Sequence, residues 1–423
     1  MARSTGFVFL KVRRALGSLT PRSGADVTRL RFDKRLYGAL FLMATSAIGP
    51  GFITQTTQFT AQLGAAFAFA ILVSIFIDVA LQLNVWRVIG VSGLRAQELG
   101  NRVAPGLGHV LTFFVVLGGF VFNVGNVAGA GLGLDALLGL DPKWGGAASA
   151  LVAIAIFLSR RAGVAMDRIV VALGLVMIAL TTYVAFVSQP PVGAALRNAV
   201  LPERIDLLSI TTLVGGTVGG YITYAGAHRL LDTGVQGPDR VAEISRASVV
   251  GVLVTGLMRV LLFLAVFGVV AAGVRLDPSN PTASAFAAAA GSAGRRVFGL
   301  ILWAAAITSV IGASYTSVSF LVGASERLAR RRNLLVVAFV GLSATVFVTA
   351  GAAPVPLLVF AGAFNGLILP IGIAVLLWVA ARRSDLLGGY AYPRYLAALG
   401  LVAWLVTLYL GWESLGRLAT LFR

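Results

Sequence analysis

The chain has 423 residues, of which 58% are hydrophobic and only 12% charged, and its mean hydropathy is +0.91. A soluble protein of this size could not cover its surface with so few polar groups, so the composition excludes a soluble globular class. The net charge of +18 comes from basic residues that lie between apolar stretches rather than on one polar face, which argues against nucleic-acid binding.

Apolar stretches that approach or exceed the length of a membrane span fill most of the chain. A spanning helix needs about 20 apolar residues. Within lipid the backbone must satisfy its own hydrogen bonds, and the strict alternation of barrel strands is absent, so these stretches are expected to be helices. We predict an all-α polytopic membrane protein with about eleven transmembrane helices, at 38–63, 66–86, 107–133, 146–159, 168–188, 208–227, 248–271, 297–323, 334–353, 355–381 and 391–412.

The basic residues are distributed unequally between the two sides of these spans. Most of the 34 Lys and Arg residues fall in the N-terminal segment or in the loops that share its side. The excess of positive charge predicts a multi-pass protein of the cell membrane with a cytoplasmic N-terminus and an external C-terminus, in contact with anionic lipids. Residues 1–35 lack an apolar core followed by a cleavage site, so we predict a basic cytoplasmic tail rather than a signal peptide.

Two of the predicted spans contain helix-weakening residues. The first contains Gly49-Pro50-Gly51, and the sixth has four glycines between 215 and 220. Interrupted spans at equivalent positions of two halves predict inverted repeats around a central binding site; close packing through small residues is the alternative. The repeats are expected at 36–190 and 207–381, with the eleventh helix and external C-terminus at 390–423.

Polar side chains accompany both interruptions. Such side chains are costly in lipid unless they face protein or water. In the tenth span, Asn365 is expected to contact either a solute or a neighbouring helix. The predicted substrate site consists of Gln55, Thr56, Thr57, Gln58, Thr60, Gly219, Gly220, Tyr221, Thr223, Tyr224 and Asn365.

Several motifs suggest a family. They are Gly49–Phe52, Leu81–Leu83 through Gly93–Leu99, Val214–Val218, and Leu357–Phe360 through Leu369–Pro370. The chain resembles the Nramp family of divalent-metal transporters. The resemblance implies a LeuT-type fold of five plus five helices in inverted repeats, with discontinuous helices 1 and 6 and transport by alternating access.

The metal-binding motifs of that family are not reproduced. The family carries Asp-Pro-Gly-Asn in span 1, and counting from Gly49–Phe52 aligns this motif with Thr60–Leu63. It carries Met-Pro-His in span 6, where the aligned residues are Gly219–Tyr221. Without the carboxylate and the thioether, no metal site is predicted. In span 3 the family's proton-carrying Asp and Glu correspond to Asn123 and Asn126, which cannot titrate.

Two charged residues remain inside predicted spans, Asp78 in the second and Arg259 in the seventh. Each alone would cost roughly 2.5–3.5 kcal/mol on insertion scales. A buried ion pair between the equivalent helices of the two repeats is one interpretation. In the other, Arg259 receives an anionic group of the substrate, or Asp78 carries the coupling proton.

Two kinds of cargo for a secondary transporter stay open. The family implies a divalent cation, but the replaced ligands imply an altered substrate; the alternative cargo is a small organic solute such as a carboxylate or an amino-acid-like molecule. A channel is less favoured because no ring-like filter sequence is present. The sequence contains no catalytic arrangement, so neither an enzyme nor a cofactor is predicted.

Overall fold

The computed structural model describes residues 39, 43–44, 46–323 and 326–418, and the predicted tail 1–35 lies outside them. Every regular element in these ranges is helical, which confirms the predicted all-α class. The helices are α3 (Pro50–Leu63), α4 (Phe67–Ser92), α5 (Ala96–Val103), α6 (Leu107–Leu138), α7 (Pro142–Leu158), α8 (Arg160–Val187), α9 (Val192–Val200), α10 (Leu207–Val218), α11 (Ile222–Asp232), α12 (Val241–Ala271), α13 (Pro281–Val322), α14 (Glu326–Arg330), α15 (Arg332–Ala350), α16 (Pro354–Arg382) and α17 (Arg394–Leu418).

The number of full-length spans is smaller than the predicted number. Among the described residues, seven helices are long and apolar enough to cross a membrane, or eight if the bent pair of α8 and α9 counts as one span. Three predicted spans do not appear as separate full-length helices: α3 has 14 residues and is counted with α4, α7 has 17 residues, and the sixth span is divided into α10 and α11 with 12 and 11 residues. The total of eleven therefore stays a prediction.

Proline and glycine set the ends of the helices. Pro50, Pro142, Pro281 and Pro354 stand at the first turns of α3, α7, α13 and α16, where a missing N–H loses no intrahelical bond. α4 ends at Gly93, whose φ of 68° is left-handed, a conformation that glycine adopts without strain.

Small residues allow α6 and α13 to pack closely. A Cβ built on Gly133 would lie 2.6 Å from the backbone nitrogen of Trp303, and one on Gly299 would lie 2.6 Å from that of Leu137. Any larger residue would push the two backbones apart, which is the usual role of small residues between membrane helices. This contact forms a framework on one side of the first span.

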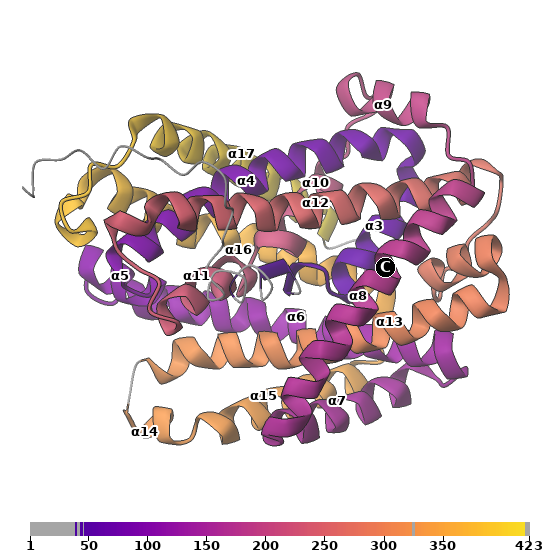
Figure 1. The fold of residues 1–423 in the computed structure, drawn as a ribbon, viewed down its shortest axis with the longest axis horizontal. Helices are drawn as coiled ribbons and strands as arrows, with labels where there is room; N and C mark the ends of the chain where they lie inside the picture. The colour runs from indigo at the N-terminus through magenta and orange to yellow at the C-terminus, as the bar shows by residue number, and fades with distance from the viewer. Residues whose placement is uncertain (1–38, 40–42, 45, 324–325, 419–423) are drawn as a thin grey trace, which may run out of the picture. The chain divides into compact units, whose positions relative to one another are not determined.

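A second group of helices surrounds the two interruptions. α12 packs against α4 and α3, and α10 packs against α4, α16 and α3. Figure 1 shows α4 and α12 running side by side. Helices distant in sequence thus meet at the short helices α3, α10 and α11. The first interruption lies where α3 begins, and the second lies between the end of α10 and the start of α11.

Candidate functional site

The interruption of span 1 lies at Ile48 and Gly49, immediately before α3. Gly49 is extended, with φ −96° and ψ −176°, and α3 begins at Pro50 without a side-chain cap. The first N–H groups of a helix have no intrahelical acceptor. The start of α3 is therefore an uncapped, electropositive helix N-terminus inside the protein.

This position corrects the register predicted for span 1. Thr60–Leu63, which counting aligned with the family's Asp-Pro-Gly-Asn, form the regular last turn of α3, and the Thr60 hydroxyl donates to the carbonyl of Thr56 at 2.6 Å. When the break itself is the reference, the motif falls on Gly49–Phe52 and shares its Pro and Gly. Gly49 then replaces the aspartate, and Phe52 replaces the asparagine.

The interruption of span 6 lies at Gly219–Tyr221, between α10 and α11, as predicted. Gly219 is extended with ψ 164°, and Gly220 is left-handed with φ 57°. A Cβ built on Gly220 would lie only 1.9 Å from Oδ1 of Asn365. The backbone geometry and the close approach of Asn365 both require glycine here.

Only one of the predicted α3 side chains reaches across to the other helices around the breaks. Gln55 is buried, donates from Nε2 to the carbonyl of Leu358 at 2.8 Å, and leaves Oε1 without a partner. Its Oε1 lies 2.3 Å from the position of a Cβ on Gly216 of α10. Gln55 therefore occupies the space between α3, α10 and α16.

The three threonines of α3 are engaged elsewhere. The hydroxyls of Thr56, Thr57 and Thr60 each donate to a carbonyl one turn earlier in their own helix, as threonine often does in membrane helices. Thr57 also accepts a hydrogen bond from Thr282 at 2.9 Å. Gln58 is partly exposed. The structure does not bring these four side chains to the breaks.

Tyr221 of span 6 does face the site. Its ring packs edge-on against Phe122 with 5.7 Å between ring centroids, and its hydroxyl interacts with the side chain of Asn126. Thr223, in contrast, donates back to the carbonyl of Val218. Tyr224, on α11, packs against Phe320. The predicted set from span 6 is thus divided between the break and α11.

Asn123 and Asn126 of α6 have different surroundings. Asn123 donates to the hydroxyls of Ser314 and Ser343, both at 3.1 Å. Asn126 is buried, and its Nδ2 has no hydrogen-bond partner. Asn126 lies at the break of span 1, because its Oδ1 is 3.8 Å from the position of a Cβ on Gly49.

Sequence reasoning named Gly49 only as a helix-weakening residue and missed Ser309 of α13, which lies beside it. The Ser309 hydroxyl is buried, has no partner, and lies 2.9 Å from the position of a Cβ on Gly49. The available signal was a second serine on the same helix, Ser317, about two turns after Ser309. Ser317 also has an unpartnered hydroxyl, 1.9 Å from the Cβ position of Gly119.

Around the breaks the site is uncharged and only partly hydrogen-bonded. Its unpartnered atoms include the acceptors of Gln55 and Asn365, the amide nitrogen of Asn126 and the hydroxyls of Ser309 and Ser317. A buried polar atom without a partner is costly, so a group of them near the two breaks indicates a place for a polar ligand. Among the described residues no three His, Cys, Asp or Glu side chains form a group that could hold a metal.

Asp78 and Arg259 lie in the helix bundle behind the breaks, on α4 and α12. Asp78 Oδ2 accepts a hydrogen bond from Thr217, in the last turn of α10, at 2.7 Å. The Arg259 guanidinium lies 4.5 Å from the ring centroid of Phe52, in the first turn of α3, and donates to Ser74 at 3.4 Å. The two charges are close enough to attract each other, but no direct ion pair within 4 Å joins them in the described chain.

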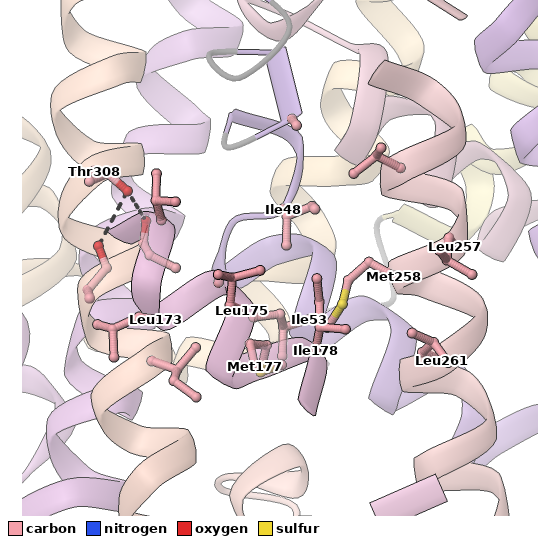
Figure 2. A pocket seen from close by; sticks show the side chains of 17 residues that line it. Ile48, Ile53, Leu173, Leu175, Met177, Ile178, Leu257, Met258, Leu261 and Thr308 are labelled. Carbon is pink, nitrogen blue, oxygen red and sulfur yellow. Dashed lines mark hydrogen bonds between the residues drawn. The ribbon is translucent and has the colours of Figure 1, made fainter. Parts of the chain in front are cut away.

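A pocket of about 320 Å³ beside the first break has the opposite character. Figure 2 shows Ile48, Ile53 and Met258 lining it, and Thr308 supplies its one polar side chain. The Thr308 hydroxyl is engaged with the carbonyls of Ala304 and Ala305. An apolar recess of this kind cannot hold a polar cargo, so it is not the candidate site.

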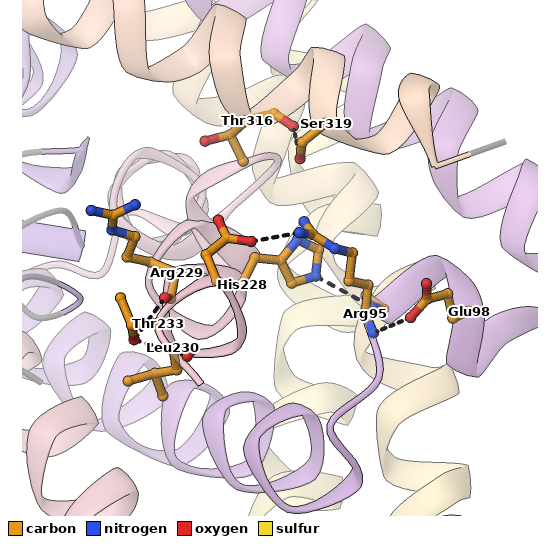
Figure 3. A network of polar contacts seen from close by, with 10 residues as sticks. Arg95, Glu98, His228, Arg229, Leu230, Thr233, Thr316 and Ser319 are labelled. Atoms are coloured by element: carbon orange, nitrogen blue, oxygen red, sulfur yellow. Dashed lines mark hydrogen bonds and ion pairs between the residues drawn. The ribbon is translucent and has the colours of Figure 1, made fainter. Parts of the chain in front are cut away.

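The C-terminal end of α11 is held by a polar network. Arg95 pairs with Asp232 at 2.6 Å, and the backbone N–H of Ala96 donates to Nε2 of His228 at 3.2 Å; Figure 3 shows both contacts around His228. Glu98 accepts from the N–H of Arg95 at 2.7 Å. These contacts fix α11 to residues 95–98, which follow α4.

Comparisons with known proteins agree with this geometry. The family model described as natural resistance-associated macrophage protein-like (Nramp) matches residues 40–415. The membrane protein YcsG of Bacillus subtilis and a membrane protein of Haemophilus influenzae are each 52% identical over 376 residues, which is 89% of this chain and 93% and 94% of theirs.

Solved structures show the fold. The manganese transporter of Eremococcus coleocola superposes with a TM-score of 0.70 at 17% identity, covering 90% of this chain and 86% of that one. MhsT in complex with L-phenylalanine superposes with a TM-score of 0.58 at 17% identity, covering 91% and 97%. The predicted LeuT-type fold is thereby confirmed.

Proposed function

The chain belongs to the Nramp family of membrane transporters, and on that premise we propose that it is a secondary transporter working by alternating access whose cargo is a small organic solute carrying a carboxylate. The observation that carries the proposal is the group of buried, uncharged and unpartnered polar atoms at the two breaks. Discontinuous helices that meet near the middle of a membrane bind the cargo in such transporters.

The site lacks what a transition metal requires. The family's aspartate and methionine correspond to Gly49 and Gly219, which have no side chain. Manganese and iron need ligands that repay their dehydration, and a carboxylate and a soft sulfur do so better than amides and hydroxyls. The E. coleocola protein is a manganese transporter of the same fold, and we propose that this chain has lost that specificity.

The same features suit an organic carboxylate. Gly49 carries no side chain at the uncapped N-terminus of α3, where backbone N–H groups favour an anion. The amide nitrogen of Asn126 and the hydroxyl of Ser309 border that position. The unpartnered oxygens of Gln55 and Asn365 can accept from an N–H or O–H group elsewhere on the solute.

Alternating access requires that the half-helices move relative to the surrounding helices. The inner half of span 6, α11, is fixed by Arg95–Asp232 and by the bond from Ala96 to His228. The Arg95–Asp232 pair is partly exposed, so breaking it costs little, whereas the bond from Ala96 to His228 is buried. We propose that they close the cytoplasmic side in this conformation and open when cargo is released inward.

A divalent cation is the second candidate, favoured by the oxygens at the site. Gln55 Oε1, Asn365 Oδ1 and the two serine hydroxyls are neutral oxygen ligands, which magnesium tolerates when it keeps part of its water shell. Family membership also supports a cation. In this case the ion would bind weakly, because no carboxylate balances its charge.

Calorimetry on the purified protein separates these candidates. Manganese, magnesium, L-alanine, pyruvate, succinate and L-glutamate are titrated singly, and uptake of whichever binds is then followed in proteoliposomes. Saturable heat with a carboxylate and none with manganese is the expected result. Tight manganese binding would contradict the loss of metal specificity, and binding of magnesium alone would favour the second candidate.

A further inference from the structure

Asp78 and Arg259 form a buried charged pair that the cargo site does not explain. They are 2% and 1% exposed, and they lie where α3, α4, α10 and α12 meet. Asp78 is hydrogen-bonded to Thr217, one turn before the break in span 6, and Arg259 stacks on Phe52, one turn after the break in span 1. The pair is therefore in contact with both short helices that border the cargo site.

Neither charge is fully satisfied by its neighbours. Oδ1 of Asp78 and both Nε and Nη2 of Arg259 have no hydrogen-bond partner. A buried charge whose counter-charge is removed is strongly unfavourable, even where the pair itself adds little stability. The positive charge of Arg259 therefore requires a nearby negative charge at all times, whether Asp78 or another group supplies it.

No other charge lies near the middle of these helices. α3 and α10 contain no charged residue at all. The remaining Asp, Glu, Arg and His residues on α4 and on the α-helices packed against it stand toward helix ends: Arg87, Glu243, Arg246, His228, Arg229, Asp232, Arg197, Arg382, Arg394, Glu413 and Arg417. The tyrosines of these helices are Tyr224, Tyr395 and Tyr409. The charge state at the centre thus depends on Asp78, Arg259 and whatever the site binds.

We infer that Asp78 takes up one proton when an anionic cargo binds, so that Arg259 exchanges the carboxylate of Asp78 for the carboxylate of the cargo as its counter-charge. The inference rests on the proposed organic-anion cargo. Without cargo, the ionised Asp78 balances Arg259. With cargo at the start of α3, the protonated Asp78 carries no charge, and its hydroxyl can donate while its carbonyl oxygen still accepts from Thr217.

This exchange couples the two ligands thermodynamically. Protonation of Asp78 leaves Arg259 unbalanced and so favours the anion, and binding of the anion favours the proton by the same factor. Proton and anion would then cross the membrane together, and an inward proton gradient would accumulate the cargo. The exchange supplies a proton carrier that Asn123 and Asn126 cannot provide.

The first test counts protons in the wild-type protein. Binding of the carboxylate that gives heat among pyruvate, succinate, L-alanine and L-glutamate is measured by calorimetry in two buffers with different ionisation enthalpies. Uptake of about one proton per bound carboxylate is expected near neutral pH. Binding without proton uptake would overturn the inference while leaving the proposed carboxylate transporter intact.

The second test assigns the proton to Asp78. In Asp78→Asn, the amide mimics the neutral acid and can still accept from Thr217, so the carboxylate should bind without proton uptake. Downhill exchange across vesicles should persist, but a pH gradient should no longer drive accumulation. Asp135→Asn, at the external end of α6 where Asp135 accepts from Asn280, is the matched control and should keep both proton uptake and accumulation.

The third test concerns Arg259. Arg259→Gln removes the charge and should weaken carboxylate binding at least tenfold, about the value of one charged hydrogen bond, whereas Arg259→Lys should retain part of it. Unchanged proton uptake in Asp78→Asn, or unchanged affinity in Arg259→Gln, would overturn the inference. If no carboxylate binds and a metal does, the organic-anion cargo itself is wrong, and the inference is wrong with it.

Discussion

Two polar regions border the short helices α3 and α10, and they differ in how their polar atoms are balanced. At the breaks, Asn126, Ser309 and Asn365 are neutral and keep atoms without partners. Behind the breaks, Asp78 and Arg259 are charged and attract each other. A buried neutral group without a partner costs less free energy than an unbalanced buried charge, so the neutral region can wait for a cargo and the charged region requires a counter-charge.

The largest effect is expected from removing one member of the charged pair. Arg259→Ala leaves Asp78 buried without its counter-charge and should lower the free energy of unfolding by about 3–5 kcal/mol. Thermal unfolding in detergent measures the loss. In the double variant Asp78→Asn/Arg259→Gln the loss should be much smaller than the sum of the single losses; additive losses would show that the two charges do not interact.

Adding a methyl group at the span 6 break tests the role of Asn365 in the neutral region. Gly220→Ala combines a left-handed φ of 57° with a Cβ 1.9 Å from Asn365 Oδ1. Asn365 must then shift, so transport should be lost and the free energy of unfolding should fall by about 2–3 kcal/mol. Gly388→Ala is the control, because its φ of 62° is similar but no atom lies within 4 Å of the Cβ. It should cost only about 1 kcal/mol and leave uptake unchanged. Equal effects of the two variants would deny Asn365 a role at the break.

Adding a charge to the neutral region should make it resemble a metal site. Gly49→Asp places a carboxylate at the break, beside Ser309, and should raise manganese affinity at least tenfold while weakening carboxylate binding. Calorimetry with manganese and succinate measures both changes. Thr60→Asp is the matched variant, because counting places the family's aspartate at Thr60. If Thr60→Asp gains manganese binding and Gly49→Asp does not, the corrected alignment is wrong.

The smallest expected effect is on Ser309. Because its hydroxyl has no partner, Ser309→Ala should leave the melting temperature unchanged or slightly raised, but weaken cargo binding by about 1 kcal/mol. Ser314→Ala provides the contrast, since Ser314 accepts from Asn123 at 3.1 Å and donates to Val310 at 2.7 Å. That variant should lose stability rather than affinity.

Much of the fold followed from local properties of the chain. Long apolar stretches, and the cost of unsatisfied backbone groups in lipid, predict helices without any knowledge of their neighbours. Proline and glycine located both interruptions for the same local reason, since they weaken a helix wherever it lies. The resemblance then predicted the LeuT-type fold, which the solved structures confirm.

The membership of the site could not be read in the same way. Thr56, Thr57 and Thr60 are as polar as Gln55, but their hydroxyls bond to their own helix and only Gln55 reaches α16. Hydropathy does not distinguish a polar residue that faces a ligand from one that satisfies itself. For this reason the predicted list contained residues that the structure assigns to helix-internal bonds.

The sequence by itself determined that the chain crosses a membrane, at which residues its helices are weakened, and that neither an acid nor a sulfur stands at those residues. Each of these is a property of single residues or short segments. Only the tertiary structure decided that the first break stands at Gly49, that Ser309 and Asn126 border it, and that Asp78 and Arg259 contact the short helices beside it. Those relations join α3, α4, α6, α12 and α13, and a contact between distant helices depends on their rotation and depth, which hydropathy leaves undetermined.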